Sequence, residues 1–323
     1  MSHRRLLAAA LAALAACLPA SPAPAAPSHD TPTPSAAQLL ASSGNAEWRT
    51  PDPRNLLVMR LPAGRVLIEL APDFAPLHVA NIRTLVRQHY FDGLAIVRVQ
   101  DNFVAQWDDP AGDDGGDQAK LRSLGKAQAT LPPEFTRPFD AKLPFTRLPD
   151  GDMYAPEVGF SEGFPVARNR AAGQEWLTHC YGMVGVGRDN PPDSGNGSAL
   201  YAVIGQAPRR LDRNLAVVGR VIDGMPLLSG LPRGKGPMGF YATPARRTLI
   251  ESVRLAADLP AAQRPAVQVL RTDSPTFAAL IEAQRNRHDA FYAVPAGRID
   301  LCSIDVPVRA ATHRARESSL RQP

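Results

Sequence analysis

Residues 96–109 constrain the fold of this chain more than any other segment. Apolar residues recur on both sides of a turn signal at residues 101–102, a pattern typical of two strands joined by a hairpin. The same segment carries Arg98, Phe103 and Gln106, whose side chains can share one face of the strand pair. A guanidinium, an apolar ring and an amide on one face predict a binding site for a proline-containing peptide.

The composition of the chain limits the functions that it can have. Of its 323 residues, 44% are hydrophobic, so one large core or two small ones are expected. The 32 prolines indicate long irregular connections between regular elements. The formal net charge of +5 includes Arg4 and Arg5, which lie in a segment that we expect to be removed. The remaining charge is too small to predict nucleic-acid binding.

The first 26 residues have the pattern of a signal peptide. Two arginines precede an Ala- and Leu-rich core at residues 6–18, and an A-x-A cleavage site follows at residues 23–25. The apolar core is too short to span a bilayer, and no later apolar run is long enough either. The sequence therefore predicts a periplasmic or otherwise exported protein. The Pro/Ala-rich residues 27–55 are expected to form a linker.

The three cysteines bear on two questions: whether a lipid anchors the mature chain, and whether a disulfide cross-links it. Residues 14–17 resemble a lipobox, so the alternative to simple secretion is a lipid anchor at Cys17. In either case only Cys180 and Cys302 remain as thiols in an oxidising compartment. A disulfide between them would pin the C-terminal segment to the core. Two separate buried thiols are the other reading of the same count.

The hydrophobic pattern after the linker predicts mainly β-structure. Residues 56–60 and 65–70 are predicted to form a hairpin, and a helix with an apolar stripe begins at Pro76. Further strands are expected at residues 183–186, 200–204, 216–221 and 248–255. We find no internal repeats.

Two segments extend beyond these strands. Residues 110–174 form a long insertion, and we expect its scattered aromatic side chains to pack on the strands as a wall or lid near the peptide site. Residues 258–323 predict a small α/β extension. It has strands at residues 267–270 and 299–301, with a helix after Ser274 between them.

The order of short motifs along the chain resembles that of the cyclophilin family of peptidyl-prolyl cis-trans isomerases. The resemblance covers residues 56–257. It rests on RVLIEL at 65–70, the helix after Ala75-Pro76 with Asn81, YFDG at 90–93, the Arg–Phe–Gln segment, and the stretches 182–188, 197–204, 210–212 and 217–224. The resemblance implies a closed antiparallel β-barrel capped by helices, within the mainly β class.

The resemblance also implies a reaction without cofactor or metal. Rotation about an X–Pro amide is opposed by about 18–20 kcal/mol, and tighter binding of the twisted amide lowers that barrier without a nucleophile. By resemblance, Arg98 weakens the amide resonance, Phe103 forms the floor of the proline pocket, and Gln106 orders the arginine or the substrate backbone. The other residues that the resemblance places against the peptide are Val104, Gly187, Arg188, Tyr201, Leu211 and Leu215.

Several positions depart from the family pattern. Trp107 replaces a glycine, which predicts a reshaped loop beside the site. Ala199 stands where the family has a glutamine that contacts the substrate, Arg210 replaces an aromatic residue, and Leu215 replaces His or Tyr. Of these positions Ala199 and Leu215, together with Arg188, favour the alternative: a non-catalytic proline-peptide-binding or envelope assembly module on the same barrel.

The sequence thus predicts an exported peptidyl-prolyl isomerase that acts on proline-containing segments of envelope proteins. We expect a monomer, no nucleic-acid partner, and membrane contact only through a lipid at Cys17. The acidic residues at 108–117 lack the spacing of a calcium loop, so a solvated loop is expected there. His179 and Cys180 are adjacent, but the sequence offers no orienting partner for a catalytic pair.

Overall fold

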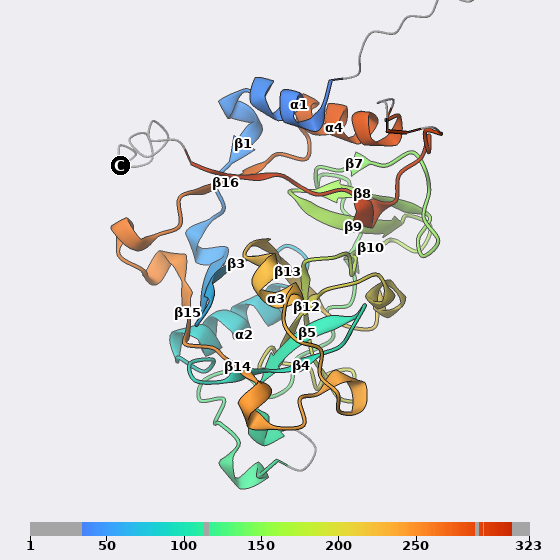
Figure 1. Cartoon of the computed structure of the whole chain (residues 1–323). Coiled ribbons are helices and arrows are strands. Elements are labelled where there is room, and N and C mark those ends of the chain that lie inside the picture. The colour runs from blue at the N-terminus through green and yellow to red at the C-terminus, as the bar shows by residue number, and fades with distance from the viewer. Residues whose placement is uncertain (1–33, 113–115, 288–290, 293, 312–323) are drawn as a thin grey trace, which may run out of the picture. The chain divides into compact units, whose positions relative to one another are not determined.

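A nine-stranded antiparallel sheet dominates the computed structural model, which describes residues 34–112, 116–287, 291–292 and 294–311 (Figure 1). The order of its strands is β14-β4-β5-β12-β11-β13-β3-β2-β15. The strands are β2 (Leu56–Leu61), β3 (Gly64–Leu70), β4 (Ala95–Val99), β5 (Val104–Asp108), β11 (Met183–Val186), β12 (Leu200–Val203), β13 (Val217–Asp223), β14 (Thr248–Leu249) and β15 (Ser252–Leu255). The prediction of a mainly β fold is confirmed.

The two ends of this sheet come from one short segment of the chain. β14 pairs with β4, β15 pairs with β2, and only Ile250 and Glu251 separate β14 from β15. The Ile250 N–H donates to Leu94 O at 2.8 Å, and the Glu251 N–H donates to Arg60 O at 2.9 Å. β14 and β15 stand at opposite ends of the strand order and do not pair with each other in the described structure, so the sheet is a curled half-barrel. The predicted closed barrel is therefore wrong.

The inner face of the curled sheet packs on the helix α2 (Pro76–Arg87). Pro76 occupies the first turn, where its missing N–H costs no helical hydrogen bond. Val79, Ile82 and Leu85 are fully buried against the sheet, as the apolar stripe predicts. A short helix, α3 (Met225–Ser229), follows β13 and buries Leu228 in the same core.

Trp107 belongs to this core and not to a loop. It lies in β5, opposite Ile96 of β4 and Leu200 of β12, and only 1% of its surface is exposed. Because successive side chains of a strand point to opposite faces, the indole fills the interior while the neighbouring Gln106 faces outward. The reshaped loop that we predicted from Trp107 does not form at this position.

Much of the predicted insertion forms a second, five-stranded sheet in the order β6-β10-β9-β8-β7. Its strands are β6 (Arg137–Pro138), β7 (Thr146–Arg147), β8 (Glu157–Ser161), β9 (Phe164–Asn169) and β10 (Gln174–Leu177). Phe160, Val166 and Trp176 of this sheet share an apolar cluster with Val104 and Tyr201 of the nine-stranded sheet. The second sheet therefore buries part of the outer face of the first.

The segment before the second sheet is tied to the start of α2. Ala75 precedes the helix and has no polar side chain to cap it. The Glu134 carboxylate takes this role, accepting from the N–H groups of Leu77 at 3.0 Å and His78 at 2.9 Å. Asn81 adds a second tie, because its Nδ2 donates to the carbonyl oxygen of Gln128 at 3.0 Å.

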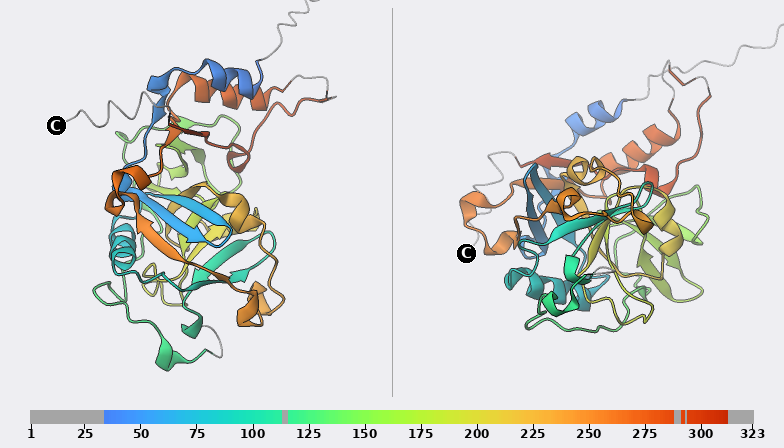
Figure 2. Two further views of the ribbon diagram at one scale, coloured as in Figure 1. Left: turned by 60° about the vertical axis from the view of Figure 1, so that its left-hand side comes forward. Right: turned by 60° about the horizontal axis from the view of Figure 1, so that its bottom comes forward.

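A third sheet joins segments from both ends of the described chain. β1 (Trp48–Arg49) pairs with β16 (Val267–Leu270), which pairs with β17 (Val308–Ala310). The helices α1 (Ala36–Ser42) and α4 (Pro275–Arg285) lie side by side above it (Figures 1 and 2). The strand predicted at residues 299–301 is absent from the described structure; a helical turn at Leu301–Ser303 forms instead, because Asp300 caps it by accepting from the Cys302 N–H.

The predicted linker is ordered over its described part. The predicted signal peptide, which includes Cys17, and residues 27–33 lie outside the described residues. Ser35 caps α1 in a capping box with Gln38, and Trp48 is 8% exposed, with its ring N–H donating to Ser43 Oγ at 2.9 Å. Composition suggested a linker, but these caps and one buried indole organise the segment. None of the helices in the described residues is long and apolar enough to cross a membrane.

A disulfide joins Cys180, just before β11, to Cys302 in the C-terminal segment. Their sequence separation of 122 residues makes the bond a cross-link between distant parts of the chain. Of the two alternatives that the cysteine count left open, the structure has the bonded one.

Replacing both Cys180 and Cys302 by alanine should lower the free energy of unfolding by about 2–5 kcal/mol. The loss follows mainly from the larger conformational freedom of an unfolded chain without the cross-link. Urea denaturation under non-reducing conditions measures it. Dithiothreitol should lower the urea midpoint of wild type to near that of the double variant. Equal midpoints of the two proteins without dithiothreitol would contradict the expectation.

Candidate functional site

Arg98 and Gln106 lie opposite each other on the outer face of β4 and β5. Their backbones are paired in the antiparallel ladder, and Arg98 Nη1 donates to Gln106 Oε1 at 3.2 Å. The register shifts between Ile96 and Arg98, so that Ile96 stands opposite the buried Trp107. Without this bulge Ile96 and Arg98, two residues apart, would share a face. The bulge therefore turns the guanidinium outward while the apolar side chain beside it stays in the core.

Phe103 is brought to the same guanidinium by the turn between the two strands. Asn102 adopts a positive φ of 52°, a conformation that asparagine accepts more readily than most residues. The Phe103 N–H donates to Gln100 O at 3.2 Å, which closes the turn. The ring is half-buried, and its centroid lies 5.3 Å from Arg98 Cζ. The three residues predicted as catalytic are thus in one place.

A loop that the sequence did not point to forms the other wall around Arg98. Arg98 Nε donates to the carbonyl oxygen of Met238 at 2.6 Å, and Arg98 Cζ lies 5.5 Å from the ring centroid of Phe240. Arg98 Nη2 also donates to Gln100 Oε1. Met238 contacts Arg98 through its backbone oxygen, and the residue type at position 238 does not predict such a contact. Phe240 lies far beyond the motif that drew attention to Arg98.

The positive charge of Arg98 has no counter-charge near it. Every acceptor named above is a neutral oxygen, and within the described residues no carboxylate forms an ion pair with Arg98. Burial lowers the pKa of the guanidinium, although an arginine keeps its proton throughout the neutral range. The site therefore presents a fixed, half-buried cation beside an apolar ring.

Two residues predicted to contact the peptide are almost completely buried. Val104 is 2% exposed and Tyr201 is 4% exposed, and both pack in the cluster shared with the second sheet. Tyr201 stands opposite Gln106 in the ladder between β12 and β5. These side chains support the site from beneath and offer little surface to a ligand.

Of the other residues predicted to contact the peptide, one borders the site, one turns away from it and two are half-buried nearby in the sequence. A Cβ on Gly187 would lie 3.8 Å from Gln106 Nε2, so Gly187 borders the site. Arg188 turns away: its Nε donates to Asn214 O at 3.0 Å, and its guanidinium lies over the ring of Phe135 in the insertion. Leu211 and Leu215 are both half-buried on the segment that follows β12.

A buried polar network lies directly behind Tyr201. The Tyr201 hydroxyl is 2.9 Å from His179 Nε2, and His179 Nδ1 is 2.9 Å from Asp212 Oδ1. Since the carboxylate accepts, Nδ1 carries a proton, and Nε2 is left to bond the tyrosine hydroxyl. Burial, and then the charge of Asp212, raises the pKa of Tyr201. The sequence missed this network because Asp212 is 33 residues from His179 along the chain.

Arg209 continues the network toward the disulfide. Its Nε donates to Asp212 Oδ2 at 3.1 Å, and its two terminal nitrogens donate to Asp152 at 3.0 and 2.8 Å. The side chains of all three residues are at most 5% exposed. Cys180 is bonded to Cys302, so the His179–Cys180 pair is not a nucleophile with its base.

Replacing Tyr201 by phenylalanine should lower the free energy of unfolding by about 1–3 kcal/mol. The change leaves Nε2 of the buried His179 without a hydrogen-bond partner, which costs about this much. Urea denaturation measures the loss. Tyr181→Phe is the matched control, because Tyr181 is 46% exposed and its loss should leave the midpoint unchanged. Equal midpoints for both variants would show that the buried hydrogen bond contributes nothing.

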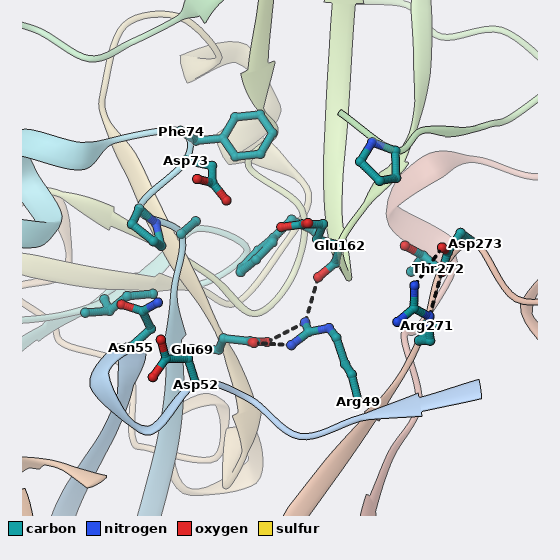
Figure 3. Close-up of a pocket in the computed structure, with 15 residues that line it drawn as sticks. Arg49, Asp52, Asn55, Glu69, Asp73, Phe74, Glu162, Arg271, Thr272 and Asp273 are labelled. Carbon is teal, nitrogen blue, oxygen red and sulfur yellow. Dashed lines mark hydrogen bonds and ion pairs between the residues drawn. The ribbon is translucent and has the colours of Figure 1, made fainter. Parts of the chain in front are cut away.

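A cavity of about 230 Å³ lies away from these residues, between the N-terminal segment, β3 and the second sheet (Figure 3). Arg49 spans it, with Nη2 donating to Glu69 Oε2 at 3.0 Å and to Glu162 O at 2.6 Å. Arg271 pairs with Asp273 on its other side. These bonds tie the segments together, and none of the predicted site residues lines the cavity. Among the residues that the structure describes, no group of three or more His, Cys, Asp or Glu is placed to hold a metal ion.

Comparisons with known proteins point to one family. The family model for cyclophilin type peptidyl-prolyl cis-trans isomerase/CLD matches residues 56–254. The probable peptidyl-prolyl cis-trans isomerase of Brucella suis biovar 1 (strain 1330) is 31% identical over 186 residues, which cover 57% of this chain and 74% of that protein. Its counterpart from Brucella abortus (strain 2308) is 30% identical over the same shares. The crystal structure of cyclophilin AquaCyp293 from Hirschia baltica matches with a TM-score of 0.65 at 27% identity, covering 82% of this chain and 94% of that one.

Proposed function

The chain belongs to the family of cyclophilin-type peptidyl-prolyl cis-trans isomerases, and on this premise we propose that Arg98, Phe103 and Gln106 are its catalytic site. Family membership makes it an isomerase of proline-containing polypeptides. One observation carries the assignment of the site. The Arg98 guanidinium is held over the Phe103 ring by neutral acceptors alone, so its charge remains available to a substrate.

The proposed mechanism needs no covalent step. Rotation about the X–Pro bond costs about 18–20 kcal/mol because the nitrogen shares its lone pair with the carbonyl. A guanidinium has five N–H groups, of which Arg98 uses one on each of its nitrogens within the protein. One N–H on each terminal nitrogen therefore remains to donate to the prolyl nitrogen. That bond strengthens as the amide twists, because the lone pair localises, so the transition state is bound more tightly than either planar form.

The other two residues hold the substrate and the arginine in place. The half-buried Phe103 ring offers an apolar floor for the pyrrolidine ring, supported by the buried Val104 beside it. Gln106 Oε1 accepts from Arg98 Nη1 and fixes the plane of the guanidinium. The Gln106 amide N–H groups point to the border with Gly187, where a substrate carbonyl can accept from them.

We propose that the enzyme assists the folding of exported proteins. The signal-peptide pattern of residues 1–26 supports an exported or periplasmic location. The Cys180–Cys302 disulfide supports it independently, since such bonds persist in oxidising compartments. Lipid attachment at Cys17 is the alternative form of the same proposal. The mass of the mature N-terminus distinguishes cleavage near residue 25 from a lipidated Cys17.

A non-catalytic proline-peptide-binding module is the second candidate. The burial of Val104 and Tyr201 favours it, because two side chains predicted to contact the peptide offer little surface. Such a module would bind proline peptides through Phe103 without accelerating their isomerisation. Comparison of binding with turnover in the same peptide decides between the two.

The isomerase activity should not change with pH between about 6 and 9. Arg98 keeps its proton in this range even though burial lowers its pKa, and burial raises the pKa of Tyr201, so neither changes charge. Phe103 and Gln106 do not titrate. Measuring kcat/KM at constant ionic strength tests this, with circular dichroism at each pH as the control for folding. A bell-shaped profile would mean that a titrating acid or base takes part.

A further inference from the structure

Arg210 stands at the edge of the proposed proline pocket. It belongs to a helical turn (Ala207–Leu211) that follows β12, and its side chain is exposed. Its Cζ lies 5.7 Å from the ring centroid of Phe103, the same ring that Arg98 approaches at 5.3 Å. Two guanidinium groups therefore flank the ring on which we place the substrate proline.

The backbone around Arg210 is anchored on both sides, so its position is fixed by the fold. On one side Gln206 N–H donates to Asn102 Oδ1 at 2.8 Å, and Ile204 N–H donates to Phe103 O at 2.9 Å. On the other side the preceding Arg209 is buried between Asp152 and Asp212. Because Arg209 points inward, its neighbour Arg210 is left facing the solvent beside Phe103.

The charges near this edge are unbalanced. The described residues give the Arg210 side chain no hydrogen bond and no ion pair, and Arg98 donates only to neutral oxygens. The acidic groups nearby are already paired: Asp101 with Arg233 at 3.0 Å, and Asp212 with Arg209 at 3.1 Å. A substrate carboxylate would therefore meet two cations that form no ion pair with a carboxylate of the described residues.

We propose that Arg210 makes the enzyme prefer substrates with an aspartate or glutamate next to the proline. This inference rests on the proposed function, because it assumes that the substrate proline ring packs on Phe103. A residue adjacent to a proline on that ring lies within side-chain reach of Arg210. An exposed ion pair of this kind contributes a preference of about three- to fivefold. The preference is electrostatic, so salt weakens it.

The test compares peptides that differ only in the residue next to proline, placed either before or after it. Glutamate and glutamine have the same shape, so their ratio of kcat/KM isolates the charge. Wild type is expected to favour the glutamate peptide by about three- to fivefold at low ionic strength, and less in about 1 M salt, where the screening length falls to about 3 Å. Arg210→Gln should bring this ratio markedly closer to one, and Arg210→Glu should shift the preference to a lysine peptide.

Arg60→Gln is the matched control, because it removes the same charge from an exposed residue of β2, a strand that does not pair with β5, and it should keep the wild-type ratio. The inference is overturned if the glutamate-to-glutamine ratio of kcat/KM is near one in wild type, or if it is unchanged in Arg210→Gln. In that case the proposed function still stands, provided that turnover depends on Arg98. Absence of turnover on every peptide overturns the proposed function and the inference together.

Discussion

Arg98→Ala is expected to lower kcat/KM for isomerisation of an X–Pro peptide by about 10²–10³-fold, the usual cost of removing a donor aimed at the charge of a transition state. Arg98→Lys should also lose most of the activity. A lysine retains the positive charge but lacks the planar fork that bonds Gln106, Gln100 and Met238 together. The side chain is half-buried and packs between Phe103 and Phe240, so its orientation is a property of the fold.

A protease-coupled assay measures this loss, and thermal denaturation of the variants checks that they fold. Arg60→Lys makes the same substitution at an exposed residue of β2 and should retain full activity. Equal activity of Arg98→Ala and wild type would remove Arg98 from the mechanism. A loss of activity with a proportional loss of folded protein would assign Arg98 a structural role instead.

Arg209→Met is expected to lower the free energy of unfolding by about 3–5 kcal/mol. The substitution leaves Asp152 and Asp212 buried without the cation that neutralises them, and breaking a buried ion pair from one side costs about this much. Urea denaturation measures the change. Arg210→Met is the matched control, since Arg210 is the next residue, is exposed and has no ion pair in the described structure. Similar losses in both variants would contradict a special role of the buried network.

That the three proposed catalytic residues lie together could be predicted from sequence because their signal is local. Arg98, Phe103 and Gln106 lie within nine residues of one another, on two strands whose turn is marked by polar residues. The bulge that orients Arg98 could not be predicted, because it depends on pairing with Trp107 in the next strand. The wall formed by Met238 and Phe240 was also missed, since it reaches the site from a loop 140 residues later.

The errors in the fold have a shared physical origin. Local composition suggested a linker around Trp48 and a loop at Trp107, but tertiary packing buries both indoles. The closed barrel failed because the two end strands of the sheet, β14 and β15, do not pair with each other in the described structure, which strand counting cannot show. Likewise His179 has an orienting partner, Asp212, that only the folded chain brings to it. Long-range contacts thus decided each case.

Exchange between the cis and trans forms of an X–Pro peptide, followed by NMR without a coupled protease, tests the catalytic claim most directly. With a catalytic amount of wild type, exchange cross-peaks between the two forms are expected within seconds, whereas the uncatalysed interconversion takes tens of seconds or longer. With Arg98→Ala the cross-peaks should disappear while peptide binding to Phe103 persists. Wild-type protein that binds the peptide and leaves the exchange at its uncatalysed rate would contradict catalysis and identify a binding module.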